Sequence, residues 1–228
     1  MRRLLLALAA VLVLGATLPA HAGSLDLRLG GFFPRADTGK SNDLFTDDAS
    51  LYTVGKSDWK GFTGGAQFNV KLARNVELGF GIDGYGRTIQ TEYRDYEREN
   101  GRAIRQSLKL DIAPISVELR LTPTSRRARI APFLGIGGDL IYWKYEEFGE
   151  FVRFSDRNLP VVEDSFVSEG VAPGFHVSGG IRFGITDDIG VTAQGRYQWG
   201  TANMGDDFRG NKLDLTGASA TIGISVRF

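Results

Sequence analysis

Apolar and polar residues alternate with a period of two along most of the chain after residue 22. In the segment 60–72, for example, Phe62 and Phe68 lie on the opposite parity from Thr63 and Gln67. Because successive side chains of a strand point to opposite faces, this pattern predicts strands with one apolar and one polar face. We find eight such segments, each long enough to cross a bilayer as a tilted strand. They are 24–33, 60–72, 76–87, 107–122, 129–143, 174–185, 190–199 and a last segment that begins near Leu213.

Two of these segments change phase along their length. In the fourth, the apolar residues lie on even positions up to Ile112 and on odd positions from Ile115 onward. A bulge at Ala113-Pro114 would restore the alternation, because proline is tolerated in a sheet at bulges. We expect a second correction of phase at Gly217, in the last segment.

The fifth segment, 129–143, alternates least regularly. We place its apolar residues outward because this choice turns Asp139 toward the polar face. The outward residues are then Ile130, Leu134, Ile136 and Leu140.

The connections between segments alternate between long and short. The long ones are 35–58, 88–106, 144–173 and 200–212, and the short ones are 73–75, 123–127 and 186–189. Long and short connections therefore lie at opposite ends of an antiparallel arrangement. Short periplasmic turns and long outer loops are typical of transmembrane β-barrels, in which closure also satisfies every strand edge. The pattern predicts an all-β fold, an eight-stranded antiparallel up-and-down transmembrane β-barrel.

A soluble β-sandwich or a lipocalin-type barrel is the alternative, because alternation alone shows only that two faces differ. In a soluble barrel the apolar face points inward. Here the polar face carries charged residues, and aromatic residues mark the ends of the segments, as in the girdles of membrane barrels. These aromatic residues are Phe32, Phe33, Trp59, Tyr85, Tyr142, Trp143, Tyr197 and Trp199. We therefore expect the apolar face to contact lipid.

The beginning of the chain indicates export. Two arginines precede an apolar run at 4–14, and a small-x-small cleavage site ends at Ala22. This arrangement is typical of a secretory signal, and the apolar run is short for a spanning helix. We predict a signal peptide at 1–22 and an outer-membrane barrel domain at 23–228.

The last strand ends on an aromatic residue. Ile222, Ile224 and Val226 occupy alternate positions, and Phe228 is the final residue. This ending resembles the C-terminal insertion signal that the barrel-assembly machinery reads in bacterial outer-membrane proteins. The resemblance implies that the three aliphatic side chains face hydrocarbon and that Phe228 lies at the membrane boundary.

Composition excludes several functions. The chain has 27 basic and 27 acidic residues, and removal of the signal leaves 25 basic against 27 acidic, so no basic field is available for nucleic acid. The chain has no cysteine, which excludes disulfides, thiolate metal sites and a lipid on an N-terminal cysteine. A glycine-rich run at 79–84 lies within an alternating strand, and the acidic residues of the connections are irregularly spaced. We expect neither a cofactor nor a metal ion.

The predicted inner face collects charges of both signs. Eight strands enclose a space about wide enough for side chains alone, so these groups are expected to pair with one another. An unpaired charge there would be costly, which favours a balanced plug over a water channel. A gated, narrow conduit whose ion pairs rearrange is the other interpretation. The predicted network comprises Arg28, Glu77, Asp83, Arg87, Glu118, Arg120, Arg182 and Arg196.

The pair His176 and Ser178 is the one serious catalytic candidate, because the two residues share a strand face and His176 is the sole histidine of the mature chain. It looks like the His-x-Ser element of outer-membrane lipid A deacylases. The parity of the strand, however, turns the pair toward the lumen, and the asparagine expected after the serine is Gly179. We therefore favour a structural histidine.

The mature chain resembles the superfamily of small eight-stranded outer-membrane β-barrels that includes protein A, protein W and opacity-type domains. The local likeness lies in 111–119 and in the run from Pro132 to Gly137. The resemblance implies localisation in the bacterial outer membrane, in contact with lipid and lipopolysaccharide. Such folds host many functions.

Three functions therefore stay open. The first is a non-enzymatic surface barrel whose connections 35–58 and 144–173 contact an external partner or shield the mouth. The second is a narrow conduit for small or apolar solutes. The third is a lipid A-modifying enzyme that uses His176 and Ser178.

Overall fold

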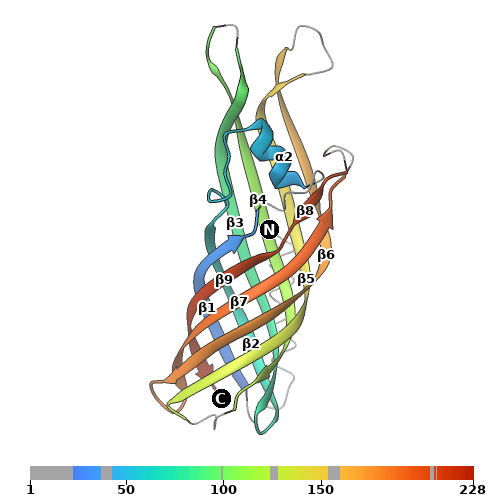
Figure 1. Cartoon of the computed structure of the whole chain (residues 1–228). Helices are drawn as coiled ribbons and strands as arrows, with labels where there is room; N and C mark the ends of the chain where they lie inside the picture. Colours follow the sequence, from blue (N-terminus) through green and yellow to red (C-terminus); the bar gives the residue numbers. More distant parts are fainter. Residues whose placement is uncertain are drawn as a thin grey trace.

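The computed structural model describes residues 23–36, 43–98, 100–123, 128–153, 160–205, 208 and 210–228. The predicted signal peptide at 1–22 lies outside the described residues. A tall barrel of strands carries one short helix, α2, near its upper end (Figure 1). The elements are β1 (Gly23–Pro34), α2 (Leu44–Leu51), β2 (Gly61–Ala73), β3 (Val76–Glu97), β4 (Ala103–Leu121), β5 (Ile130–Val152), β6 (Val161–Gly184), β7 (Ile189–Asn203), β8 (Lys212–Asp214) and β9 (Gly217–Arg227).

The strands close into a ring, which confirms the predicted antiparallel barrel. Each strand pairs antiparallel with its neighbour in sequence from β1 to β7, β7 pairs with β8 and β9, and β9 pairs with β1. β8 and β9 together occupy one position in the ring, so the barrel has eight positions. No helix among the described residues is long and apolar enough to cross a membrane.

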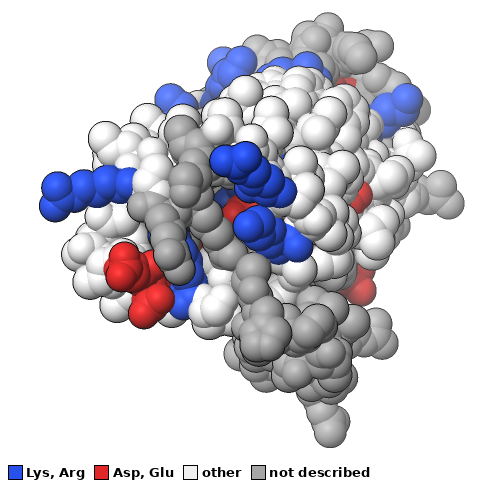
Figure 2. Space-filling model, turned by 90° about the horizontal axis from the view of Figure 1, so that it is seen from below, with Lys and Arg blue, Asp and Glu red and all other residues white. Residues whose placement is uncertain are grey.

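Apolar side chains cover the outside of the barrel wall. Leu27, Leu134 and Ile222 are 54%, 68% and 63% exposed, although each is a large aliphatic residue. In the view from below, wide areas of the wall carry no charged residue (Figure 2). The outward placement predicted for the fifth strand is confirmed as well, because Asp139 is buried inside. This inverted polarity suits a lipid environment.

The two ends of the described chain meet at the lower end of the barrel. The Gly23 amide donates to the Phe228 carbonyl at 3.1 Å, and the Phe228 ring stacks on Phe68 with centroids 5.9 Å apart. The turn between β2 and β3 and the turn between β6 and β7 lie at this same end, where the C-terminus is marked in Figure 1. Of the C-terminal residues, Ile222, Ile224, Val226 and Phe228 are all exposed on the outer wall.

Strands β3 to β6 rise well above the rest of the barrel (Figure 1). Two connections predicted as long loops, 88–106 and 144–173, are therefore largely strand. β3 still pairs with β4 at Glu92↔Arg105, and β5 pairs with β6 up to Val152↔Val161. The prediction failed because alternation is weaker there, where neither face of the hairpins contacts lipid.

The bulge predicted at Ala113-Pro114 is absent. β4 pairs with β5 without a shift from Gln106 to Leu121, and its even-numbered side chains point inward along this whole length. Leu108 and Leu110 are fully buried on the same inner face as Glu118 and Arg120. The surroundings change rather than the register: within the membrane the barrel interior is polar, whereas above it the interior is an apolar core and the outer face meets water.

The correction of phase predicted at Gly217 is also absent. β8 and β9 pair with β7 in one continuous register, as Thr201↔Asp214 and Gln198↔Gly217 show. The ladder is only interrupted between them, and the Leu215 amide still donates to the Gly200 carbonyl at 3.0 Å.

The core above the membrane contains several of the aromatic residues that were expected in an outer girdle. Phe32, Trp59, Tyr85 and Trp143 are buried in the interior, whereas Phe33, Tyr142, Tyr197 and Trp199 lie on the outer wall. Helix α2 packs into this core, and its Phe45 meets Trp59 edge to face with centroids 5.1 Å apart. The helix and this core together close the mouth of the barrel.

Candidate functional site

The lumen within the membrane contains a network of charged side chains from β1, β3, β4, β5, β6 and β7. Alternation puts these residues on inner positions of their strands, as the sequence predicted. Of the predicted residues, Arg28, Glu77, Asp83, Glu118, Arg120, Arg182 and Arg196 lie inside the barrel, seven in all. The prediction does not hold for Arg87, which is exposed near the mouth and donates to the Asp58 carbonyl at 2.8 Å.

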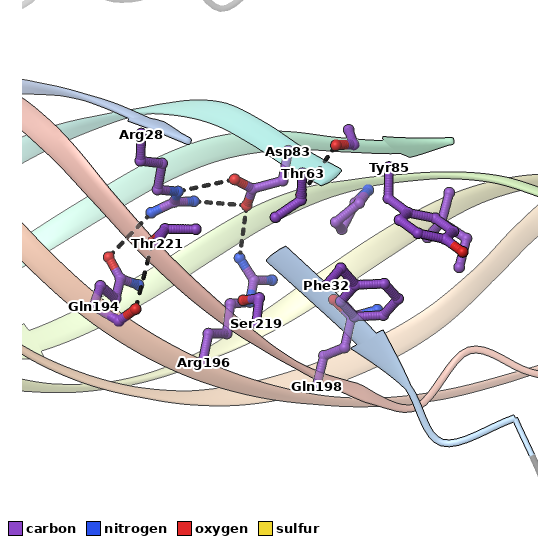
Figure 3. Close-up of a pocket in the computed structure, with 13 residues that line it drawn as sticks. Arg28, Phe32, Thr63, Asp83, Tyr85, Gln194, Arg196, Gln198, Ser219 and Thr221 are labelled. Carbon is purple, nitrogen blue, oxygen red and sulfur yellow. Dashed lines mark hydrogen bonds and ion pairs between the residues drawn. The ribbon is translucent and has the colours of Figure 1, made fainter. Parts of the chain in front are cut away.

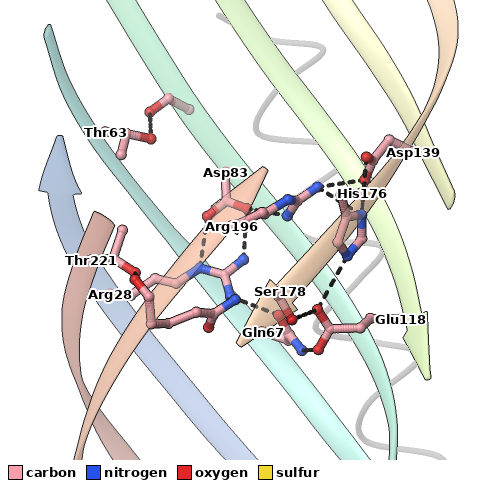
Figure 4. A network of polar contacts seen from close by, with 12 residues as sticks. Arg28, Thr63, Gln67, Asp83, Glu118, Asp139, His176, Ser178, Arg196 and Thr221 are labelled. Carbon is pink, nitrogen blue, oxygen red and sulfur yellow. Dashed lines mark hydrogen bonds and ion pairs between the residues drawn. The ribbon is translucent and has the colours of Figure 1, made fainter. Parts of the chain in front are cut away.

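Asp83 joins two arginines in the upper part of this network. Arg28 grips Asp83 with two hydrogen bonds, Nε–Oδ1 at 2.8 Å and Nη2–Oδ2 at 2.6 Å (Figures 3 and 4). Arg196 donates to Asp83 Oδ2 at 3.0 Å through Nη1 and to Asp139 Oδ1 at 2.5 Å through Nη2. Such paired guanidinium contacts are the geometry that makes arginine suited to buried ion pairs.

His176 lies between two carboxylates (Figure 4). Its Nδ1 is 3.0 Å from Asp139 Oδ1, and its Nε2 is 3.1 Å from Glu118 Oε2. A carboxylate only accepts hydrogen bonds, so both ring nitrogens donate only when the imidazole carries both protons. Sequence parity put His176 in the lumen but did not show that it bridges β4 and β5.

A second group of ion pairs lies lower in the lumen. Arg120 donates to Glu118 Oε1 at 2.9 Å and to Asp26 Oδ2 at 3.1 Å. The guanidinium of Arg182 is 3.6 Å from Asp26 and 3.8 Å from Glu77. Among the described residues of the network, four buried arginines thus face five carboxylates, and a protonated His176 balances the count.

Neutral side chains complete the network, and the sequence analysis did not single out the glutamines. Arg28 Nη1 donates to Gln67 at 2.6 Å and to Gln194 at 3.3 Å. Gln67 in turn donates to Glu118 at 3.1 Å. Their inward parity was the signal that would have found them.

Side chains leave little open space in this part of the lumen. A cavity of about 20 Å³ lies between Arg28, Thr63, Asp83, Gln194 and Arg196 (Figure 3). This volume holds about one water molecule. The geometry is that of a plug held by ion pairs.

His176 and Ser178 do not form a nucleophile and base. Ser178 Oγ donates to Glu118 Oε2 at 2.7 Å, the same oxygen that faces His176 Nε2. Both side chains are buried in the lumen, away from lipid. A catalytic pair needs a direct hydrogen bond from nucleophile to base, and this arrangement instead gives both residues a structural partner.

The mouth contains two more buried carboxyl groups, Asp48 on α2 and Glu147 on β5. Asp48 accepts a hydrogen bond from the Tyr145 hydroxyl at 2.7 Å. Burial, together with the nearby Glu147, raises the pKa of Asp48 well above its ordinary value. Burial also raises the pKa of Glu147 to about 7. The pair therefore retains a proton near neutral pH.

No cluster of three or more histidine, cysteine, aspartate or glutamate side chains within the described ranges is arranged to hold a metal ion. Asp206 and Asp207, two acidic residues of the connection 200–212, lie outside those ranges. The chemistry of the site is ion pairing and steric closure.

Solved structures share this architecture. The neisserial surface protein A (NspA) superposes with a TM-score of 0.52 at 10% identity, over 91% of this chain and 97% of the other. The outer membrane protein OprG from Pseudomonas aeruginosa superposes with a TM-score of 0.54 at 11% identity, over 92% and 96%. The chain has the fold of a small outer-membrane β-barrel. No protein-family model matches the barrel, and a comparison with curated proteins finds no match.

Proposed function

We propose that this outer-membrane barrel is a non-enzymatic surface protein that presents its raised hairpins to an external partner. One observation carries the proposal. In the described part of the chain the interior of the barrel is filled, whereas four strands extend beyond the mouth. The lumen is filled by ion pairs, and helix α2 covers the mouth, whereas β3–β4 and β5–β6 project beyond them (Figure 1).

The outer faces of these hairpins carry both charged and apolar side chains. Lys109 and Asp111 point outward on β4, and Glu146 lies on the neighbouring face of β5. Phe148 and Val167 are 39% and 43% exposed above the membrane. Exposed apolar residues among charges are typical of surfaces that bind other proteins.

Crosslinking in intact cells tests this proposal. A photoreactive residue placed at Phe148 is expected to form adducts with a macromolecule outside the cell. The same residue at Leu134, which faces lipid on the same strand, is the matched control and should give lipid adducts only. Absence of any macromolecular adduct at Phe148, with the barrel shown to be folded, would contradict a partner-binding role.

Planar-bilayer recording separates this proposal from a conduit. A plug that leaves room for about one water is expected to give no ion current. Stable, stepwise conductance of the purified barrel would favour the conduit instead.

Mass spectrometry of lipid A tests the enzymatic alternative. We expect lipid A acylation to be unchanged in cells that express the barrel, because His176 and Ser178 are buried in the lumen.

A further inference from the structure

A groove lies on the outer wall of the barrel, where the apolar band ends toward the mouth. Its volume is about 540 Å³, and its floor is formed by Phe33, Ala218 and Tyr197. These three residues stand side by side on β1, β9 and β7, because Phe33 pairs with Ala218 and Ala218 pairs with Tyr197. The floor is thus a continuous apolar surface across three strands.

Three cationic side chains border this floor. They belong to Arg35, Lys56 and Lys60, and Ser57 adds a hydroxyl group. Within the described part of the chain, neither lysine side chain makes a hydrogen bond or an ion pair. Arg35 donates through Nε to Asp214 at 2.7 Å and is still 45% exposed. The groove therefore has unused positive charge above an apolar base.

The turn that carries the two lysines is held firmly. Its acidic residue, Asp58, points back into the turn and accepts a hydrogen bond from the Gly55 amide at 2.8 Å. Arg87 donates to the Asp58 carbonyl at 2.8 Å, and the next residue, Trp59, is buried in the core. The backbone that carries the lysines is thus fixed before any ligand arrives, so only their side chains lose freedom on binding.

Below the groove, the outer wall first carries small residues and then large apolar ones. Directly beneath the floor, the outward row consists of Gly31, Ala220 and Gly195, which pair across the same three strands. A Cβ added to Gly195 would meet no atom closer than 4.0 Å, so the wall is open at this residue, whereas the Phe33 ring lies over Gly31 and would be 3.1 Å from a Cβ there. The next row contains Leu29 and Ile222, 57% and 63% exposed.

We propose that this groove binds the phosphorylated headgroup of an outer-leaflet glycolipid of the lipid A type. Phosphate oxygens contact Lys56, Lys60 and Arg35, since ammonium and guanidinium groups form strong charge-assisted hydrogen bonds with phosphate. The sugar ring lies against the aromatic floor, and the acyl chains descend past Gly195 and Ile222 into the hydrocarbon. Charge complementarity and continuity with the lipid-facing wall identify the occupant as a lipid rather than a free anion.

Calorimetric titration of the purified barrel in detergent tests the site. The probes are bisphosphorylated lipid A, the same lipid without its phosphates, and pyrophosphate. Lipid A is expected to bind, and the double substitution Lys56→Gln/Lys60→Gln should raise the Kd of lipid A about tenfold, because two exposed charge pairs with the phosphates are lost. The matched control is Lys109→Gln/Lys144→Gln, which removes two lysines from β4 and β5 and should leave the Kd unchanged.

The other probes distinguish the sources of phosphate. Loss of the phosphates should raise the Kd of the lipid at least as much as the double substitution does, because Arg35 then loses its partner too. Pyrophosphate should bind far more weakly than lipid A. The proposal is overturned if Lys56→Gln/Lys60→Gln binds lipid A like the unsubstituted barrel, or if pyrophosphate competes on equal terms. Heat-modifiable migration in gels shows that each variant is folded.

Discussion

Each charged residue of the lumen is held by partners from other strands, so its removal leaves a charge behind. Asp83 illustrates this, because it receives three hydrogen bonds from Arg28 and Arg196. Buried ion pairs add little net stability, but a broken pair is strongly destabilising. The ion pairs of the lumen therefore maintain the shape of the barrel mainly because breaking one of them is costly, and less because each intact pair adds stability.

Substitution of one partner measures this effect. Arg28→Met should lower the free energy of unfolding in detergent by about 3 kcal/mol, because Asp83 then lacks its bidentate partner. The double variant Arg28→Met/Asp83→Leu should recover part of the loss. Arg87→Met is the control, since Arg87 is exposed, and it should change the free energy of unfolding by less than about 1 kcal/mol. An equal loss in all three variants would contradict the network.

The buried pair at the mouth makes the docking of helix α2 sensitive to pH. The pKa of Glu147 is about 7 in the folded barrel, above its ordinary value of 4.5, so the folded state holds a proton that the undocked state releases. The stability that this proton provides is fully present below pH 4.5 and is lost as the pH rises through about 7. The carboxyl group of Asp48 titrates together with that of Glu147, and the Tyr145 hydroxyl donates a hydrogen bond to Asp48.

Hydrogen exchange of the peptide that spans α2 checks this dependence. Exchange in the wild-type barrel, divided by exchange in Glu147→Gln at the same pH, cancels the intrinsic effect of pH on amides. This ratio should rise severalfold between pH 5.5 and pH 8.5 as the wild-type helix loosens. A flat ratio would show that Glu147 does not control the helix.

At the scale of elements, β4 shows how one uninterrupted strand serves two environments. Its even-numbered side chains include apolar Leu110 above the membrane and charged Arg120 within it, yet both point inward. From the sequence, the change of polarity at Ala113-Pro114 was interpreted as a change of register. The pattern records the contrast between two faces, and it cannot distinguish a bulge from a change in what surrounds the strand.

Single cysteines test the uninterrupted register, and the natural absence of cysteine makes each of them a clean probe. Lys109→Cys should react rapidly with a water-soluble maleimide, because the side chain at this position points to water. Leu110→Cys should be protected until the barrel unfolds. With a bulge, the protection pattern would be reversed, and the labelling rates in detergent would show it.

The sequence predicted the strands that cross the membrane and most residues of the lumen, because alternation directly reflects lipid on one side. It did not predict the hairpin extensions, in which apolar and polar residues alternate less regularly along each strand. There the charged Glu147, for example, pairs with the apolar Phe166. Nor did it predict which charges meet. His176 is opposite Gly137 in the ladder, yet its ring reaches Glu118 and Asp139, since strand tilt brings together side chains from different levels.

The two ends of the barrel differ: one carries short turns, and the other carries tall hairpins. The turn between β6 and β7 is close to the chain ends, whereas the hairpins β3–β4 and β5–β6 stand at the opposite end (Figure 1). This asymmetry places the groove, the mouth and the hairpins on one side of the membrane. The two proposed contacts, of the hairpins with an external partner and of the groove with a glycolipid, then lie on the same side.

Labelling of intact cells tests that orientation. Lys109→Cys should be modified by a membrane-impermeant maleimide, and Asp187→Cys, in the turn between β6 and β7, should react only after the outer membrane is opened. The two variants are read out on the same gel by a shift in mass. Modification of Asp187→Cys alone in intact cells would show that the barrel is inserted the other way round.

The ring joins strands that follow one another along the chain at every position except where β1 meets β9. Each earlier pairing closes only a short stretch of chain and has a small entropic cost, but this one brings together residues as far apart as Ser24 and Arg227. Hairpins can therefore assemble progressively from local contacts. We expect the seam to form last, so that until it closes both of its edges expose unpaired amides and carbonyls.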